Sequence, residues 1–255
     1  MGAWSPWGRF VRNRAELDLL IYAEITDRRQ SDGRDRTDIL SMLISSQDAD
    51  GNGMSDLELH DELMTLLVAG HETTATALAW AIYWINYLPE VKEKLLADIA
   101  TLGAEPDAMA INKLPDLNAV CSETLRIYPV AMFTFPRRVN EEISIEGYDL
   151  KQGMTVMGCI YLTHHREDLY PEAYLFKPER FLERQFSPYE YLPFGGGARR
   201  CVGVALAQLE LKLVLVEILT SCQMSLTGKL PIIPARRGIT LGQKGDVTIR
   251  VTSKK

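Results

Sequence analysis

One cysteine, Cys201, stands between a glycine-rich segment with two arginines and a long apolar run. The segment reads Phe194-Gly-Gly-Gly-Ala-Arg-Arg-Cys-Val-Gly203, and the run after it predicts a helix to about Ser221. Cysteine is a nucleophile or a soft metal ligand as the thiolate, which a helix N-terminus and nearby arginines stabilise. The glycines let the backbone pass close to a flat or bulky group. A buried cysteine after a flexible turn is the alternative reading.

A second polar group, Glu72 and Thr73, falls in the middle of an apolar run. Two interpretations stay open at this point. The pair could deliver protons to a reaction site, or it could form a satisfied polar kink of a helix. Further along, Glu123 and Arg126 are one helical turn apart and Arg180 is a third candidate partner. Taken alone, such a pair predicts a surface ion pair.

The composition narrows the class of protein. The chain has 255 residues, 46% of them hydrophobic, and a net charge of −6 without a basic block, so we expect no nucleic-acid partner. The four cysteines are far apart and form no C-x-x-C, which excludes a disulfide framework and a zinc module. The first residues lack the apolar core of a signal peptide, and we expect a cytoplasmic protein.

A long helix must carry Glu72 and Thr73. Ser55 and Glu58 form a capping box, and the helix that they open runs over about 56–88. A carboxylate at bilayer depth costs roughly 3 kcal/mol, so we expect no membrane span in this chain. The helix is instead expected to be buried along most of its length.

The remaining elements predict a mainly α protein with small β-sheets, organised as a single domain over residues 1–255. The segment 48–53 resembles the start of a calcium loop, but the twelfth position is Leu59, so it predicts a solvated turn. Helices are expected over 15–30, 39–44, 89–102 and 117–127, strands over 143–145 and 155–157, and hairpins in the tail.

In chain order, the motifs are A-G-x-E-T-T, E-x-x-R, P-E-R-F and F-x-x-G-x-R-x-C-x-G. Together they resemble the cytochrome P450 family, the haem-thiolate monooxygenases, and the resemblance covers nearly all of the chain. The cysteine motif matches at Phe194, Gly197, Arg199, Cys201 and Gly203. The resemblance implies a cytochrome P450 fold whose amino-terminal portion is missing, because only 54 residues precede Ser55.

The resemblance also implies a haem b site. Cys201 would be the axial thiolate and metal ligand, in the loop 194–203. Phe194 would pack beside the sulfur, glycines would make room for the porphyrin, and arginines would pair with the propionates. The implied cofactor-binding residues are Cys201, Phe194, Gly195, Arg199, Arg137, Gly203 and Ala69.

Further roles come with the family. Glu72 and Thr73 match the catalytic acid–alcohol pair that relays protons to bound dioxygen, and Glu123, Arg126 and Arg180 match a buried structural triad. The positions implied for substrate contact are Ala69, Val130, Ala131, Met132 and Phe133, with Leu241–Gln243 as a further candidate range.

The implied reaction inserts one oxygen atom of O2 into a small apolar substrate. The wording of the segments ETLRIYP and FKPERF is similar to bacterial oxidisers of fatty acids, alkanes or terpenoids. Electrons would come from a ferredoxin or flavoprotein reductase docked on the cysteine side. The alternatives are a haem protein for sensing or storage and a truncated, catalytically impaired haem-binding remnant.

Overall fold

The computed structural model describes residues 2, 4–31, 36–103, 106–228 and 230–254. Its contacts divide the chain into two compact units, Met1–His71 and Glu72–Lys255. The boundary between the units falls within one long helix, α3 (Asp56–Tyr87). The assignment of the whole chain to a single domain stays a prediction.

The first unit contains α1 (Pro6–Gln30), α2 (Ile39–Ser45) and the beginning of α3. Helix α1 starts earlier than the apolar pattern predicts, because the Ser5 hydroxyl accepts the Gly8 N–H at 3.0 Å and Pro6 occupies the first turn. The core of this unit is small and consists of Ile21, Ile25, Leu40 and Leu59. Segment 48–53 is the expected turn, with the Asp48 carboxylate accepting the Asn52 N–H at 2.8 Å.

Helix α3 begins with the predicted capping box. The Ser55 N–H donates to Glu58 Oε2 at 2.8 Å, and the Glu58 N–H donates to Ser55 Oγ at 3.3 Å. The prediction that α3 is buried along most of its length is wrong, since 67–72 are exposed and Val68 is 70% accessible. Leu59 and His60 are buried near the start of α3, and burial resumes at Ala77, where the core of the second unit packs against the helix.

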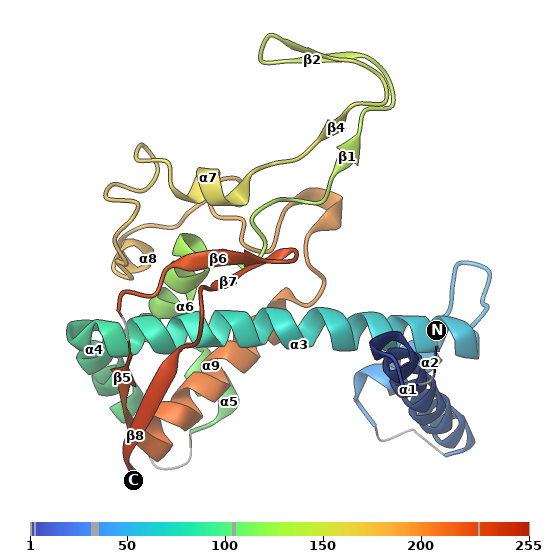
Figure 1. Cartoon of the computed structure of the whole chain (residues 1–255), viewed down its shortest axis with the longest axis horizontal. Coiled ribbons are helices and arrows are strands. Elements are labelled where there is room, and N and C mark those ends of the chain that lie inside the picture. The colour runs from blue at the N-terminus through green and yellow to red at the C-terminus, as the bar shows by residue number, and fades with distance from the viewer. Residues whose placement is uncertain (1, 3, 32–35, 104–105, 229, 255) are drawn as a thin grey trace. The chain divides into compact units, whose positions relative to one another are not determined.

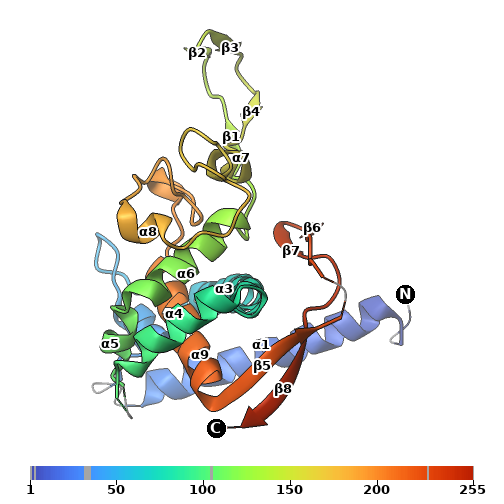
Figure 2. The same ribbon diagram turned by 90° about the vertical axis from the view of Figure 1, so that its left-hand side faces the viewer.

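The second unit gathers α4 (Pro89–Ala100), α6 (Pro115–Ile127) and α9 (Val204–Ser221) around the carboxyl-terminal part of α3 (Figure 2). Three short helices complete it, α5 (Ala108–Asn112), α7 (Ile160–His164) and α8 (Arg180–Glu183). Aromatic rings fill much of this core. Trp84, for example, stacks on Phe176 with centroids 4.8 Å apart.

The described strands form two-stranded antiparallel sheets, which confirms the mainly α fold class with small sheets. The hairpin of β2 (Ile143–Ile145) and β3 (Tyr148–Leu150) extends beyond the pair β1 (Arg137–Arg138) and β4 (Thr155–Val156) (Figure 1). The tail contains the expected hairpin, β6 (Pro234–Arg237) with β7 (Thr240–Gln243). It lies in sequence between the paired strands β5 (Cys222–Thr227) and β8 (Thr248–Lys254).

Candidate functional site

Cys201 lies in the segment that leads into α9, orange in Figure 1. It is exposed, and it precedes the N-cap residue Gly203 by two positions. A Cβ built on Gly203 would stand 3.9 Å from Cys201 Sγ, so the sulfur lies beside the start of α9. The N–H groups and the dipole of a helix N-terminus favour negative charge there, which suits a thiolate.

The loop before Cys201 depends on glycine at two positions. Gly195 has φ +70° and Gly197 has φ +63°, a region that other residues enter only with strain. The Gly195 N–H donates to Leu192 O at 2.9 Å, and the Cys201 N–H donates to Phe194 O at the same distance. Phe194 packs against the core of the second unit, which ties the loop to the helices beneath it.

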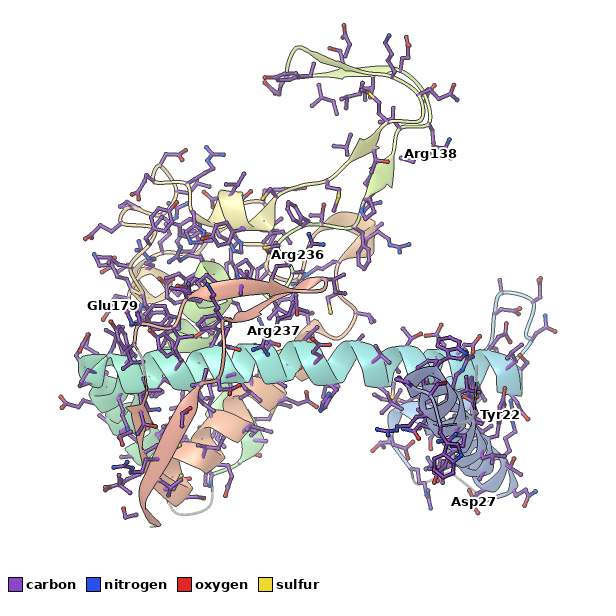
Figure 3. The ribbon with its side chains drawn as sticks, in the orientation of Figure 1. Tyr22, Asp27, Arg138, Glu179, Arg236 and Arg237 are labelled. Carbon is purple, nitrogen blue, oxygen red and sulfur yellow. The ribbon has the colours of Figure 1, made fainter. Side chains whose placement is uncertain are left out.

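Aromatic and cationic side chains meet next to this loop. The Arg199 guanidinium lies over the ring of Phe135, 5.6 Å from its centroid. Arg137 is exposed on β1, and Figure 3 labels the next residue, Arg138, where β1 leads into the projecting hairpin. The side chain of Val202 is 91% accessible directly after the cysteine.

The segment implied for substrate contact runs beside β7. Ala131 forms a β-bridge with Thr240, and Phe133 forms one with Cys159. Val130 is buried, Met132 is half-buried, and the other two side chains are exposed. The range 241–243 is buried within β7, and the Leu241 N–H donates to Val130 O at 2.8 Å.

Ala69, Glu72 and Thr73 follow one another along α3 at helical spacing. Ala69 and Glu72 are exposed, and Thr73 is half-buried. The interpretation of Glu72 as a carboxylate inside a buried helix is therefore wrong, because this turn lies in the exposed stretch of α3.

The second unit brings Glu123, Arg126 and Arg180 together. Glu123 and Arg126 are both 0% accessible and form a two-pronged ion pair, with Nε–Oε2 at 2.7 Å and Nη2–Oε1 at 2.8 Å. Arg180 Nε reaches Glu123 Oε1 at 3.4 Å. The Lys177 N–H donates to the same oxygen at 2.8 Å, and Arg126 Nη1 donates to His164 O at 2.8 Å. The interpretation of the pair as a surface ion pair is wrong, since both charges are buried and hydrogen-bonded.

His164 belongs to the same buried network, and sequence reasoning missed it. Its Nδ1 lies 3.1 Å from Arg126 O, and its Nε2 accepts the Leu192 N–H at 3.0 Å. Burial lowers the pKa of His164 to about 3, because the charged ring is poorly solvated there. The sequence carries no signal that separates His164 from its neighbour His165.

The residues around Cys201 suit a haem. Across the described ranges, no three His, Cys, Asp or Glu side chains are grouped to hold a metal ion. Of the four free cysteines, Cys201 is the exposed one. One thiolate suits a metal that arrives with ligands of its own, as in a porphyrin. The exposed Val202 suits an apolar macrocycle, and Arg199 and Arg137 suit its anionic edge.

The family model described as Cytochrome P450 matches residues 5–249. A Mycobacterium tuberculosis protein that carries the name cytochrome P450 135B1 is 42% identical over 258 residues, covering 97% of this chain and 53% of the relative. Cytochrome P450 139 from the same species is 34% identical over 230 residues, covering 87% and 53%. The chain thus spans about half the length of the curated relatives it matches.

Solved structures give the same result. Cyanobacterial CYP120A1 with bound retinoic acid matches with a TM-score of 0.89 and 26% identity, covering all of this chain and 59% of that chain. The haem domain of cytochrome P450DA matches with a TM-score of 0.85 and 26% identity, covering 94% and 55%. In the part of the chain that the structure describes, no helix is long and apolar enough to span a membrane.

Proposed function

Because the chain belongs to the cytochrome P450 family, we propose that it forms the thiolate side of a haem monooxygenase, with Cys201 as the iron ligand. The observation that carries this proposal is the exposed thiol beside the start of α9, preceded by a loop with two positive-φ glycines. When bound, haem b supplies the activation of O2 and the transfer of one oxygen atom.

The chain's own residues bind and orient the cofactor. Cys201 would hold the iron through its sulfur, and the start of α9 would favour the negative charge of a thiolate. Gly195 and Gly203 keep side chains away from the macrocycle. Arg199 and Arg137 are exposed and would pair with the propionates.

Proton transfer is assigned to α3. Thr73 Oγ1 would hold a proton for the reaction, and Glu72 would exchange protons with water. The exposure of the Glu72 side chain supports this division, because a carboxylate in contact with water is readily reprotonated. Ala69, one turn earlier, contributes a small side chain to the same part of the helix.

We assign substrate contact to 130–133, which presents the exposed side chains of Ala131 and Phe133. Apolar contacts of this kind suit a fatty acid, an alkane or a terpenoid. One of the similar solved structures holds retinoic acid, an apolar carboxylic acid, which favours this substrate class. A ferredoxin or flavoprotein reductase is the proposed electron donor, docked on the cysteine side.

A second candidate function is a catalytically impaired haem-binding remnant. The exposed stretch 67–72 of α3 favours it, because large exposed apolar side chains such as Val68 normally mark a surface that another element covers. In this case the chain would bind haem through Cys201 without turning over substrate.

Replacing Thr73 by Ala separates the two functions. The haem-loaded chain is supplied with a reductase, and electron consumption, peroxide and oxidised product are measured with fatty acids and retinoic acid as probes. A monooxygenase loses coupling, so that peroxide rises at the expense of product, because Thr73 Oγ1 no longer holds the proton. Thr65→Ala is the matched control on α3, since Thr65 is exposed and its hydroxyl donates to Asp61 O at 2.8 Å.

Two outcomes of the Thr73 experiment count against these assignments. Unchanged coupling in Thr73→Ala removes Thr73 from proton delivery. Absence of product from the unsubstituted chain with every probe favours the remnant.

A further inference from the structure

The buried ring of His164 connects α6 to the segment that carries the cysteine. Both of its nitrogens face backbone groups, Arg126 O at 3.1 Å from Nδ1 and the Leu192 N–H at 3.0 Å from Nε2. A carbonyl can only accept a hydrogen bond and a backbone N–H can only donate one. The ring must therefore be neutral, with its proton on Nδ1 and its lone pair on Nε2.

The hydrogen bonds continue from Leu192 toward the thiol. Leu192 O accepts the Gly195 N–H, and Phe194 O accepts the Cys201 N–H, each at 2.9 Å. His164 thus fixes Leu192, the first residue of the turn that Gly195 closes. Phe194 lies within this turn and accepts the N–H of Cys201. The backbone carbonyl of His164 accepts a hydrogen bond from Arg126 Nη1 at 2.8 Å. Arg126 of α6 therefore holds both the ring and the backbone of His164.

A second contact supports the same end of the loop. Tyr191 stacks on His164 with centroids 5.6 Å apart and an interplanar angle of 20°, and its hydroxyl donates to Ser122 O at 3.1 Å. Loss of the histidine hydrogen bonds therefore leaves Tyr191 as an anchor. We expect the loop to shift without the unit unfolding.

We propose that His164 is a positioning residue for Cys201: its neutral ring, protonated on Nδ1, couples α6 to the backbone of the thiolate loop through Leu192. The inference rests on the proposed function of Cys201 as the iron ligand. It concerns the placement of the thiolate and not the chemistry, because His164 touches neither the sulfur nor the reacting atoms.

The test compares two neighbouring histidines. His164→Phe keeps a ring against Tyr191 and removes both hydrogen bonds. His165→Phe is the matched control, since the His165 ring bonds to Tyr161 O at 2.8 Å and no described contact links it to the loop. His164→Gln, whose amide has an NH2 group that donates and an oxygen that accepts, is the conservative variant.

The first readout is amide hydrogen exchange at Leu192 and Cys201, which does not require haem. We expect the amides of Leu192 and Cys201 to exchange about tenfold faster in His164→Phe, because the loss of one hydrogen bond changes an opening equilibrium by about that factor. Exchange in His165→Phe should not change. The second readout is the reduced, carbon-monoxide-bound spectrum. The fraction with the red-shifted Soret band of thiolate ligation falls in His164→Phe, stays at the wild-type level in His165→Phe, and is intermediate in His164→Gln.

Different results would overturn the proposed function of Cys201 and the inference about His164. A wild-type chain without the thiolate-type band overturns the proposed function, and exchange at Cys201 then still decides the inference. Wild-type exchange at Cys201 together with a wild-type band in His164→Phe overturns the inference alone. If His164→Phe does not fold, the same criteria apply to His164→Leu, which also removes both hydrogen bonds of the ring.

Discussion

Burial decides what the Glu123–Arg126 pair on α6 does for the protein. Both side chains are 0% accessible, and Lys177, His164 and Arg180 satisfy their remaining atoms. A buried pair of this kind adds little beyond its desolvation cost when intact, but a single remaining charge is strongly destabilising. The pair therefore holds the segments around α6 in one arrangement.

We predict that Arg126→Ala destabilises the protein by about 3–5 kcal/mol, because it leaves the Glu123 carboxylate buried without its partner. Urea unfolding measures this change. Arg166→Ala is the control, since Arg166 pairs with Asp168 on the surface and should unfold like the wild type. Similar unfolding of Arg126→Ala and the wild type would contradict the structural role of the pair.

How much of the site is predictable differs from residue to residue. The sequence alone predicts the chemistry of Cys201 and the helical spacing of Glu123 and Arg126. The burial of that pair is not, because it depends on segments that arrive from α7 and α8. His164 was missed for the same reason, since its two partners are backbone groups 38 and 28 residues away.

At the scale of elements, a buried histidine links α1 to α3 within the first unit. His60 Nε2 lies 2.9 Å from Asp18 Oδ1 on α1, and Nδ1 lies 3.1 Å from Asp61 Oδ1. The ring also stacks on Tyr22, with centroids 4.7 Å apart. The hydrogen bonds to Asp61 and Asp18 raise the pKa of His60 against the opposing effect of burial.

This contact predicts a pH dependence with a definite sign. The folded state binds the proton of His60 more tightly than the unfolded chain, whose histidines titrate near about 6.5. The stabilisation is therefore complete below that pH and is lost as the pH rises through the raised pKa of folded His60. Chemical unfolding of the wild type and His60→Gln between pH 6 and 9, each relative to its own value at pH 6, measures it.

In that comparison the wild type should lose more stability than His60→Gln as the pH rises. Equal slopes would show that folding does not raise the pKa of His60. The result concerns the first unit, since Asp18, Asp61 and Tyr22, the described residues that contact the ring, belong to it.

The elements themselves were predicted unevenly. Long helices with a cap or an initial proline were found, as with Ser55 before α3 and Pro89 at the start of α4. The short helices α5, α7 and α8 were missed, because four or five residues are too few to show a period. The exposure of 67–72 was also missed, since an apolar run does not say what covers it.

For the molecule as a whole, the central claim is that Cys201 is the haem ligand. The chain spans about half the length of its curated relatives, so that claim must be tested on the residues that it does contain. The thiol, its glycine loop and the buried network behind it all lie in the unit Glu72–Lys255. The prediction that Cys201 binds haem therefore concerns residues of this unit.

The most direct measurement is the absorption spectrum of the haem-loaded chain after reduction and exposure to carbon monoxide. We predict the red-shifted Soret band of thiolate ligation in the wild type and in Cys222→Ala, the control for a cysteine on the same unit. Cys201→Ala should lack the band, because no other thiol lies beside the start of α9 among the residues described. A wild-type Soret band without the red shift, or an unchanged spectrum in Cys201→Ala, would contradict the account.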